Sequence, residues 1–209
     1  MVEYHLKTPL SEEDVRKLKV GDVVYISGLI FTARDAAHKK MLEIYRSGGN
    51  LPFDPRGLVV YHVGPVVKRV GNSWTIVAAG PTTSARMEGL EAEFLEAFGV
   101  RGIIGKGGMF ERTTKACMRL GAFYGAFVGG CAILAARAVE EVEAVFWLEE
   151  LGIPEAVWLL RVKKFGPLIV AIDSHGNNML KGFLGISLFI CFIHILYAVT
   201  RVSCLVRVR

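Results

Sequence analysis

The sequence predicts an α/β domain with a mixed central sheet and flanking helices. Short segments rich in β-branched residues alternate with segments of helical periodicity through residues 1–180. Some of the strand segments follow one another as hairpins do, which indicates antiparallel strands beside parallel ones. No repeat of fixed period and no Pro/Ser-rich linker divides these residues. We therefore expect one domain.

The composition excludes several other classes of protein. The chain has 209 residues, of which 52% are hydrophobic and 22% charged, and can bury a sizeable core. It is not disordered, collagen-like or of low complexity. The net charge of +5 is uneven, because residues 181–209 hold four basic residues and no acidic one. We treat residues 1–180 as the domain and residues 181–209 as a hydrophobic, basic tail.

Periodicity, capping residues and turns place the elements along the domain. Ser11 is positioned to cap a short helix, and Gly99 follows the end of a longer one. Helices are expected at 33–47, 86–98, from about Glu111 onward and at 130–138. Strands are expected at 23–30, 58–63, 74–79, 103–104, 122–128, 142–147, 157–162 and 168–172, with a Gly71-Asn72 turn separating the second from the third.

The cysteines do not predict a metal site. Cys117, Cys131, Cys191 and Cys204 form no CxxC pair, and no histidine stands at ligand spacing from them. We expect no metal and no iron–sulfur cluster on this chain. The first residues lack a basic segment followed by an apolar one, so we expect no secretory signal. A cytoplasmic protein with free thiols is the corresponding expectation.

Three junctions between a strand and a helix are the candidate functional segments: residues 28–38, 79–87 and 104–109. Side chains and free backbone N–H groups converge at such strand ends. In the second junction Thr82, Thr83 and Ser84 are consecutive hydroxyls at a helix start, which favours a bound carboxylate or phosphate. Arg86 can add a bidentate contact to that anion. Plain helix capping with a surface arginine is the alternative.

The other two junctions each contribute a cation. Lys106 stands between glycines, but the G-x-x-x-x-G-K-[ST] spacing is absent, and a glycine turn with a solvated lysine is the alternative. Arg34 lies at a helix start, where a cation is disfavoured, which indicates a ligand role or pairing with Asp35. His38 lies one turn further. These cations and threonines describe a site for a small dianion. The sequence shows no paired acid and no Cys–His or Ser–His–Asp arrangement. The predicted anion site is therefore half of an active site.

The motifs FTARDAAH (31–38), AGPTTSARM (79–87) and IGKGGM (104–109), with residues 147–158 and 165–177, resemble the β subunit of class I fumarate hydratase. The same module forms the C-terminal domain of single-chain class I fumarases and the β subunit of L-tartrate dehydratase. The likeness spans roughly residues 5–178. It implies a swivelling β/β/α domain and a hydro-lyase that converts fumarate to L-malate, a step of the tricarboxylic acid cycle. Dehydration of L-tartrate to oxaloacetate is the alternative.

The resemblance also implies a partner. An α subunit would carry a [4Fe–4S] cluster on three cysteines, with one iron open as a Lewis acid. The expected assembly is α2β2, with a possible β–β dimer inside it, and this chain alone is expected to be inactive. The scarcity of cluster-type cysteines here agrees with that division.

Residue roles follow from the matching motifs. The equivalents of Arg34, Arg86 and Lys106 hold the substrate carboxylates, and Lys106 also assists catalysis. Thr82 matches the proposed base that removes the C3 proton of malate, and Thr83 assists in binding. A threonine hydroxyl is a poor base, so this role requires help from the cations. Asp35, His38 and Ser84 are secondary candidates, and the roles of Asp173 and His175 stay open.

The sequence also bears on functions other than catalysis, namely anion binding, nucleic-acid binding and membrane attachment. A non-catalytic module that binds small anions through the glycine-rich loops is the rival outside enzymes. Nucleic acid is not expected as a partner, because residues 1–180 are nearly neutral, with 21 Lys and Arg against 20 Asp and Glu. Residues 182–199 carry no Asp, Glu, Lys or Arg. The length of this uncharged run is at the lower limit for a membrane helix. The tail is a buried helix, an α-subunit interface, a membrane anchor or disordered, and we do not expect an anchor.

Overall fold

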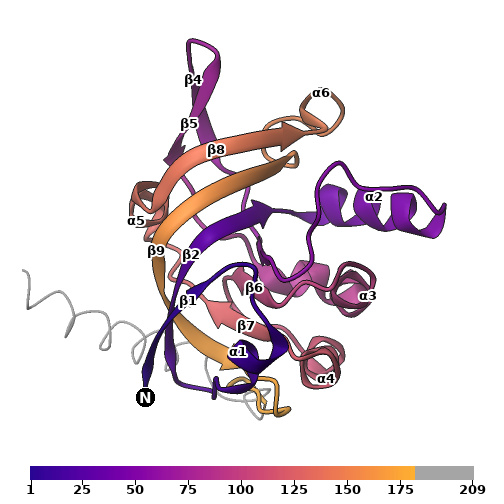
Figure 1. The fold of residues 1–209 in the computed structure, drawn as a ribbon, viewed down its shortest axis with the longest axis vertical. Helices are drawn as coiled ribbons and strands as arrows, with labels where there is room; N and C mark the ends of the chain where they lie inside the picture. The colour runs from indigo at the N-terminus through magenta and orange to yellow at the C-terminus, as the bar shows by residue number, and fades with distance from the viewer. Residues whose placement is uncertain (182–209) are drawn as a thin grey trace, which may run out of the picture. The chain divides into compact units, whose positions relative to one another are not determined.

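Five neighbouring parallel strands, followed by two that pair antiparallel, form a seven-stranded mixed sheet (Figure 1). The computed structural model describes residues 1–181. The sheet order is β1-β2-β3-β6-β7-β9-β8, and β9 also pairs antiparallel with β2. The predicted mixed sheet with flanking helices is confirmed, and the swivelling character stays an expectation. The bounds are β1 (Glu3–Lys7), β2 (Val23–Thr32), β3 (Val59–Tyr61), β6 (Gly102–Gly105), β7 (Phe123–Ala126), β8 (Val139–Phe146) and β9 (Val157–Ile172).

The strands pack two hydrophobic cores, one on each face. Side chains alternate between the faces, so Val59 and Tyr61 of β3 join one core and Val60 joins the other. Helices α2, α3 and α4 lie along one face (Figure 1) and supply Met41, Phe94 and other apolar side chains to the second core. The helices are α1 (Glu12–Arg16), α2 (Asp35–Arg46), the 3-10 helix η1 (Ser84–Met87), α3 (Glu88–Phe98), α4 (Glu111–Leu120), α5 (Ala132–Arg137) and α6 (Leu148–Leu151).

Capping residues and hydrophobic periodicity predicted the bounds of most elements to within a few residues of those observed. Ser11 caps α1 as predicted, since its hydroxyl accepts from the Asp14 amide and the Asp14 carboxylate accepts from the Ser11 amide, each at 3.1 Å. Gly99 ends α3 in the left-handed conformation at φ 60°. The helix expected at 86–98 begins instead as the 3-10 turn η1 and becomes α-helical at Glu88.

Two strand predictions are wrong in connectivity. The turn at Gly71 joins β4 (Val66–Val70) to β5 (Ser73–Ala78) in a separate two-stranded sheet, rather than separating the strands expected at 58–63 and 74–79. The strands expected at 157–162 and 168–172 are the single strand β9. Positive φ angles at Lys164 and Gly166 and shifts of register show a bulge there rather than a break.

Residues 1–179 form one compact unit. None of the helices within residues 1–181 is long and apolar enough to cross a membrane. The four alternatives for the tail fall on residues 182–209, outside the described residues.

Candidate active site

The three junction segments meet at the carboxyl ends of β2, β3 and β6. The backbone joins the second and third segments to each other and to the end of β3: the Thr82 amide donates to the His62 carbonyl at 2.7 Å, and the Lys106 amide donates to the Thr82 carbonyl at 3.3 Å. The Ser84 amide donates to the Lys106 carbonyl at 3.0 Å. Residues 82–84 therefore lie alongside the ends of β3 and β6. This edge of a parallel sheet is where α/β proteins bind ligands.

Arg34 stands at the N-cap of α2, and Glu155 compensates its position there. The Arg34 Nε atom is 3.1 Å from one Glu155 carboxylate oxygen, and the other oxygen accepts from the Ala36 amide at 3.0 Å. Glu155 thus neutralises the misplaced cation and caps the positive end of the helix. The partner of Arg34 is Glu155 rather than the neighbouring Asp35.

Arg86 links the first junction to the second. Its guanidinium forms an ion pair with Asp35, and its Nε lies 3.3 Å from Asp35 Oδ1. A second nitrogen of Arg86 donates to the Thr82 hydroxyl at 3.4 Å. The structure therefore brings Asp35, Thr82 and Arg86 together, with the threonine hydroxyl directly beside a cation.

Lys106 and Thr83 lie exposed at the same edge. Their backbones pair in a parallel bridge. The Lys106 stem passes over Gly129, where a Cβ atom would lie 2.9 Å from the lysine Cδ, so the glycine leaves room for it. We call Arg34, Thr82, Arg86 and Lys106 the rim. It presents three cations and one hydroxyl.

Two secondary candidates face the interior instead. Ser84 is fully buried, with its hydroxyl 3.0 Å from His62 Nδ1 and accepting from Tyr124 at 3.3 Å. Gly105 makes this possible, because a Cβ there would lie 1.8 Å from the Ser84 oxygen. His38 is also fully buried, with Nδ1 2.9 Å from the Arg34 carbonyl oxygen.

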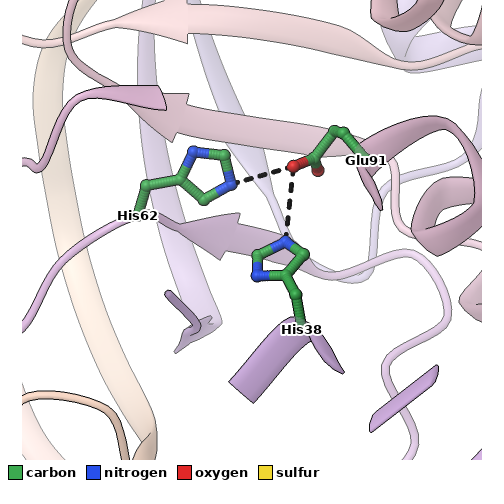
Figure 2. A group of neighbouring side chains, drawn as sticks. All are labelled: His38, His62 and Glu91. Atoms are coloured by element: carbon green, nitrogen blue, oxygen red, sulfur yellow. Dashed lines mark ion pairs between the residues drawn. The ribbon is translucent and has the colours of Figure 1, made fainter. Parts of the chain in front are cut away.

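Sequence reasoning missed two buried residues beneath the rim, His62 and Glu91. The Nε2 atoms of His62 and His38 lie 3.1 and 3.3 Å from Glu91 Oε2 (Figure 2). Burial raises the pKa of Glu91, but the two facing imidazoles outweigh it and hold that pKa at about 2. Burial lowers the pKa of His62. A glutamate on the apolar face of the helix at 86–98 was the signal available.

The described residues do not fit an iron–sulfur cluster. Cys117 is buried in α4, where burial raises the pKa of its thiol, and Cys131 stands at the start of α5. Within residues 1–181 these are the two cysteines, fewer than the three thiolates of a cluster with one open iron. The chemistry that these residues offer is the binding of negative charge and proton transfer at a hydroxyl.

Comparison with known proteins identifies the family of this chain. The family model described as "Fumarase C-terminus" matches residues 1–183, and the chain belongs to that family. A putative L(+)-tartrate dehydratase subunit beta from Methanocaldococcus jannaschii is 52% identical over 170 residues, covering 81% of this chain and 87% of the relative. The L(+)-tartrate dehydratase subunit beta of Escherichia coli strain K12 is 47% identical over 175 residues, covering 84% and 85%.

A third relative carries the other activity. A putative class I fumarate hydratase from Geobacillus stearothermophilus is 45% identical over 175 residues, which cover 83% of this chain but 33% of that protein. Both kinds of relative are hydro-lyases. This chain is accordingly a component of a hydro-lyase of the class I fumarase and tartrate dehydratase type.

Proposed function

We propose that the chain is the β subunit of a two-subunit hydro-lyase and that its rim binds a four-carbon dicarboxylate. The observation that carries this proposal is that segments bearing Arg34, Arg86 and Lys106 gather at one edge of the sheet, where Arg86 donates to the Thr82 hydroxyl. A dicarboxylate brings two negative charges, and bidentate guanidinium contacts suit its carboxylates.

The same cations assist the elimination of water. Removing the proton beside a carboxylate places further negative charge on that carboxylate, and cations fixed in advance stabilise the charge as it develops. Asp35 and Glu155 hold Arg86 and Arg34 in place before substrate arrives. Little reorganisation is then required when the substrate binds.

Thr82 is the proposed base for the C3 proton, with Thr83 assisting. Its hydroxyl accepts a hydrogen bond from Arg86, and a cation at that position favours the deprotonated oxygen over the neutral hydroxyl. Lys106, whose amide donates to the Thr82 carbonyl, fixes the threonine backbone and adds positive charge to the same region.

Fumarate and L-malate are the first proposed substrate pair. The second candidate is L(+)-tartrate, which carries one more hydroxyl on the same carbon skeleton. It is favoured by the tartrate dehydratase β subunits, of which this chain covers 85% and 87%. Only a third of the fumarate hydratase relative is covered.

The partner in this proposal is an α subunit. We place the [4Fe–4S] cluster on that subunit, in an α2β2 assembly in the cytoplasm, because the described cysteines of this chain do not fit a cluster. The rest of the active site then comes from the α subunit, and this chain alone is inactive.

The test is to co-express the chain with its α subunit and assay L-malate, fumarate and both tartrate enantiomers. Arg86→Ala, Lys106→Ala and Thr82→Val should each lower kcat/KM by about a hundredfold or more at unchanged iron content. Lys39→Ala, an exposed cation on α2, is the matched control and should leave kcat/KM unchanged. Near-normal activity in all three variants would overturn the rim assignment. Tight binding of anions with no turnover of any substrate would favour the non-catalytic module.

A further inference from the structure

His38, His62 and Glu91 form a buried cluster that the proposed reaction does not use. They come from α2, from the residue that follows β3 and from α3, so the cluster ties three elements together (Figure 2). All three side chains are fully buried. Their donor atoms, one from each residue, lie within 4.8 Å of one another.

The polar atoms at the centre of this cluster are unsatisfied by the described residues. His38 Nε2, His62 Nε2 and both carboxylate oxygens of Glu91 lack a hydrogen-bond partner of proper geometry within residues 1–181. The two Nε2 atoms approach Glu91 Oε2 to 3.3 and 3.1 Å, yet neither ring N–H direction meets that oxygen as a hydrogen bond requires. Buried polar groups are rarely left in this state.

The outer ring nitrogens fix which inner atoms can donate. His38 Nδ1 faces the Arg34 carbonyl oxygen at 2.9 Å, and because a carbonyl can only accept, Nδ1 carries the proton. In the neutral ring Nε2 then presents a lone pair toward a carboxylate that also presents lone pairs. His62 Nδ1 is likewise engaged, by the Ser84 hydroxyl at 3.0 Å. A cation between the inner atoms would remove this conflict.

We propose that His38, His62 and Glu91 bind a divalent transition-metal ion, with Zn²⁺ as the best match. Two imidazole nitrogens and a carboxylate are a common Zn²⁺ donor set. Metal–ligand bonds of about 2.0–2.1 Å place tetrahedral ligand atoms about 3.3 Å apart. The two nitrogen–oxygen separations in the cluster, 3.1 and 3.3 Å, agree with that spacing.

The surroundings have the features of a metal site. Metal-bound histidines donate their second ring nitrogen to a carbonyl or a polar side chain, as His38 does to Arg34 and as Ser84 allows for His62. The second Glu91 oxygen can complete the coordination as a bidentate ligand. The ion would hold together segments that carry Arg34 and Ser84, directly beneath the rim, and it would serve the structure rather than the reaction.

We expected no metal on this chain because its cysteines have no CxxC pair and no histidine at ligand spacing. The three ligands are separated by 24 and 29 positions in the chain and lie on different elements. This inference stands on its own geometry and does not depend on the proposed function.

The experiment measures metal in the full chain, purified without a polyhistidine tag from cells grown with added zinc. Elemental analysis should find about one Zn²⁺ per chain after desalting, and His62→Gln and Glu91→Gln should retain less than about a tenth of it. His5→Gln, an exposed histidine, is the control and should keep the full content. Metal content unchanged in both cluster variants would overturn the proposal.

A cobalt measurement covers the case in which the variants fail to fold. The unmodified chain is unfolded with a chelator and refolded with Co²⁺. We expect the strong visible absorption of tetrahedral Co²⁺, without thiolate charge-transfer bands in the near ultraviolet, and its loss when Zn²⁺ is added. No cobalt absorption, together with a zinc-free native chain, would overturn the proposal. Thiolate bands would assign the metal to cysteines and equally overturn the proposal.

Discussion

The rim and the buried cluster come from the same chain segments but face opposite ways. Arg34 at the N-cap of α2 and His38 in the helix lie about one turn apart, and the first is partly exposed while the second is fully buried. The two rim arginines pair with partly exposed carboxylates, whereas Glu91 is fully buried between two histidines and accepts no hydrogen bond from the described residues. The difference shows that one turn of helix separates residues available to a ligand from residues that fix the rim in place.

The largest expected effect lies on the rim. In the proposed site Arg34 holds a substrate carboxylate, so with Arg34→Ala in the assembled enzyme kcat/KM should fall about a hundredfold while stability changes by less than about 1 kcal/mol. Steady-state assays and chemical unfolding of the same preparation check both parts. A variant that lost stability but kept kcat/KM within threefold would place Arg34 with the buried residues instead.

A substitution at Gly105 tests the packing between the rim and the buried cluster. Gly105→Ala forces a Cβ against the Ser84 hydroxyl, at 1.8 Å, and close to His62 Nδ1, at 3.3 Å, so we expect a loss of about 3 kcal/mol in the free energy of unfolding. The control is Gly89→Ala on α3, where a Cβ meets nothing within 4 Å. Helix propensity predicts that this control gains up to about 1 kcal/mol. Equal effects of the two substitutions in urea unfolding would contradict the packing described here.

Asp173 is a buried carboxylate with the opposite environment from Glu91. It accepts from the backbone amides of Val20 at 3.1 Å, His175 at 2.9 Å and Asn177 at 3.0 Å, and also from the Asn177 side chain. Burial raises the pKa of Asp173, but these hydrogen bonds outweigh it and the net pKa is lowered. The Asp173 carboxylate therefore stabilises the turn formed by residues 173–177.

Asp173→Asn should cost about 2 kcal/mol of stability at neutral pH, because an amide cannot accept all of these bonds. Because the folded-state pKa lies below the unfolded value of about 3.9, the advantage of the aspartate is complete above that pH. It should shrink as the pH falls through the folded-state pKa. Unfolding curves of both proteins from pH 7 to pH 3 measure this, and a difference that grew toward acid pH would be contrary to it.

Ser84→Ala gives the smallest expected effect and is the finest test of the difference between the rim and the buried cluster. Loss of the hydroxyl leaves His62 Nδ1 and Tyr124 without their shared partner, which should cost about 1 kcal/mol of stability. Turnover should stay within about twofold, since the hydroxyl faces the interior. A large fall in kcat with unchanged stability would move Ser84 to the rim.

The sequence was informative where local chemistry is unusual. A cation at a helix start, hydroxyls in a row and a lysine among glycines marked all three junctions, and parallel strand ends explain why they meet. The catalytic and binding roles of Thr82, Arg86 and the other rim residues stay predictions. The capped helix α1 and the glycine-terminated α3 followed from short-range rules as well.

What the sequence could not supply depends on distant contacts. The strand β4 is short and largely exposed, and β1 is defined by its pairing with β2, so neither has a strong local pattern. The bulge in β9 looked like a gap between strands for the same reason. Glu91 is defined by two histidines, 29 and 53 positions before it, that only the fold brings to it.

The central claim is that the rim binds a dicarboxylate, and its most direct test is a binding constant without turnover. Succinate, a four-carbon dicarboxylate with no hydroxyl to eliminate, is titrated calorimetrically into the assembled enzyme. We expect Arg86→Ala and Lys106→Ala each to raise the Kd of succinate about tenfold or more, while Lys39→Ala leaves it unchanged. Equal Kd values for all four proteins would contradict the claim.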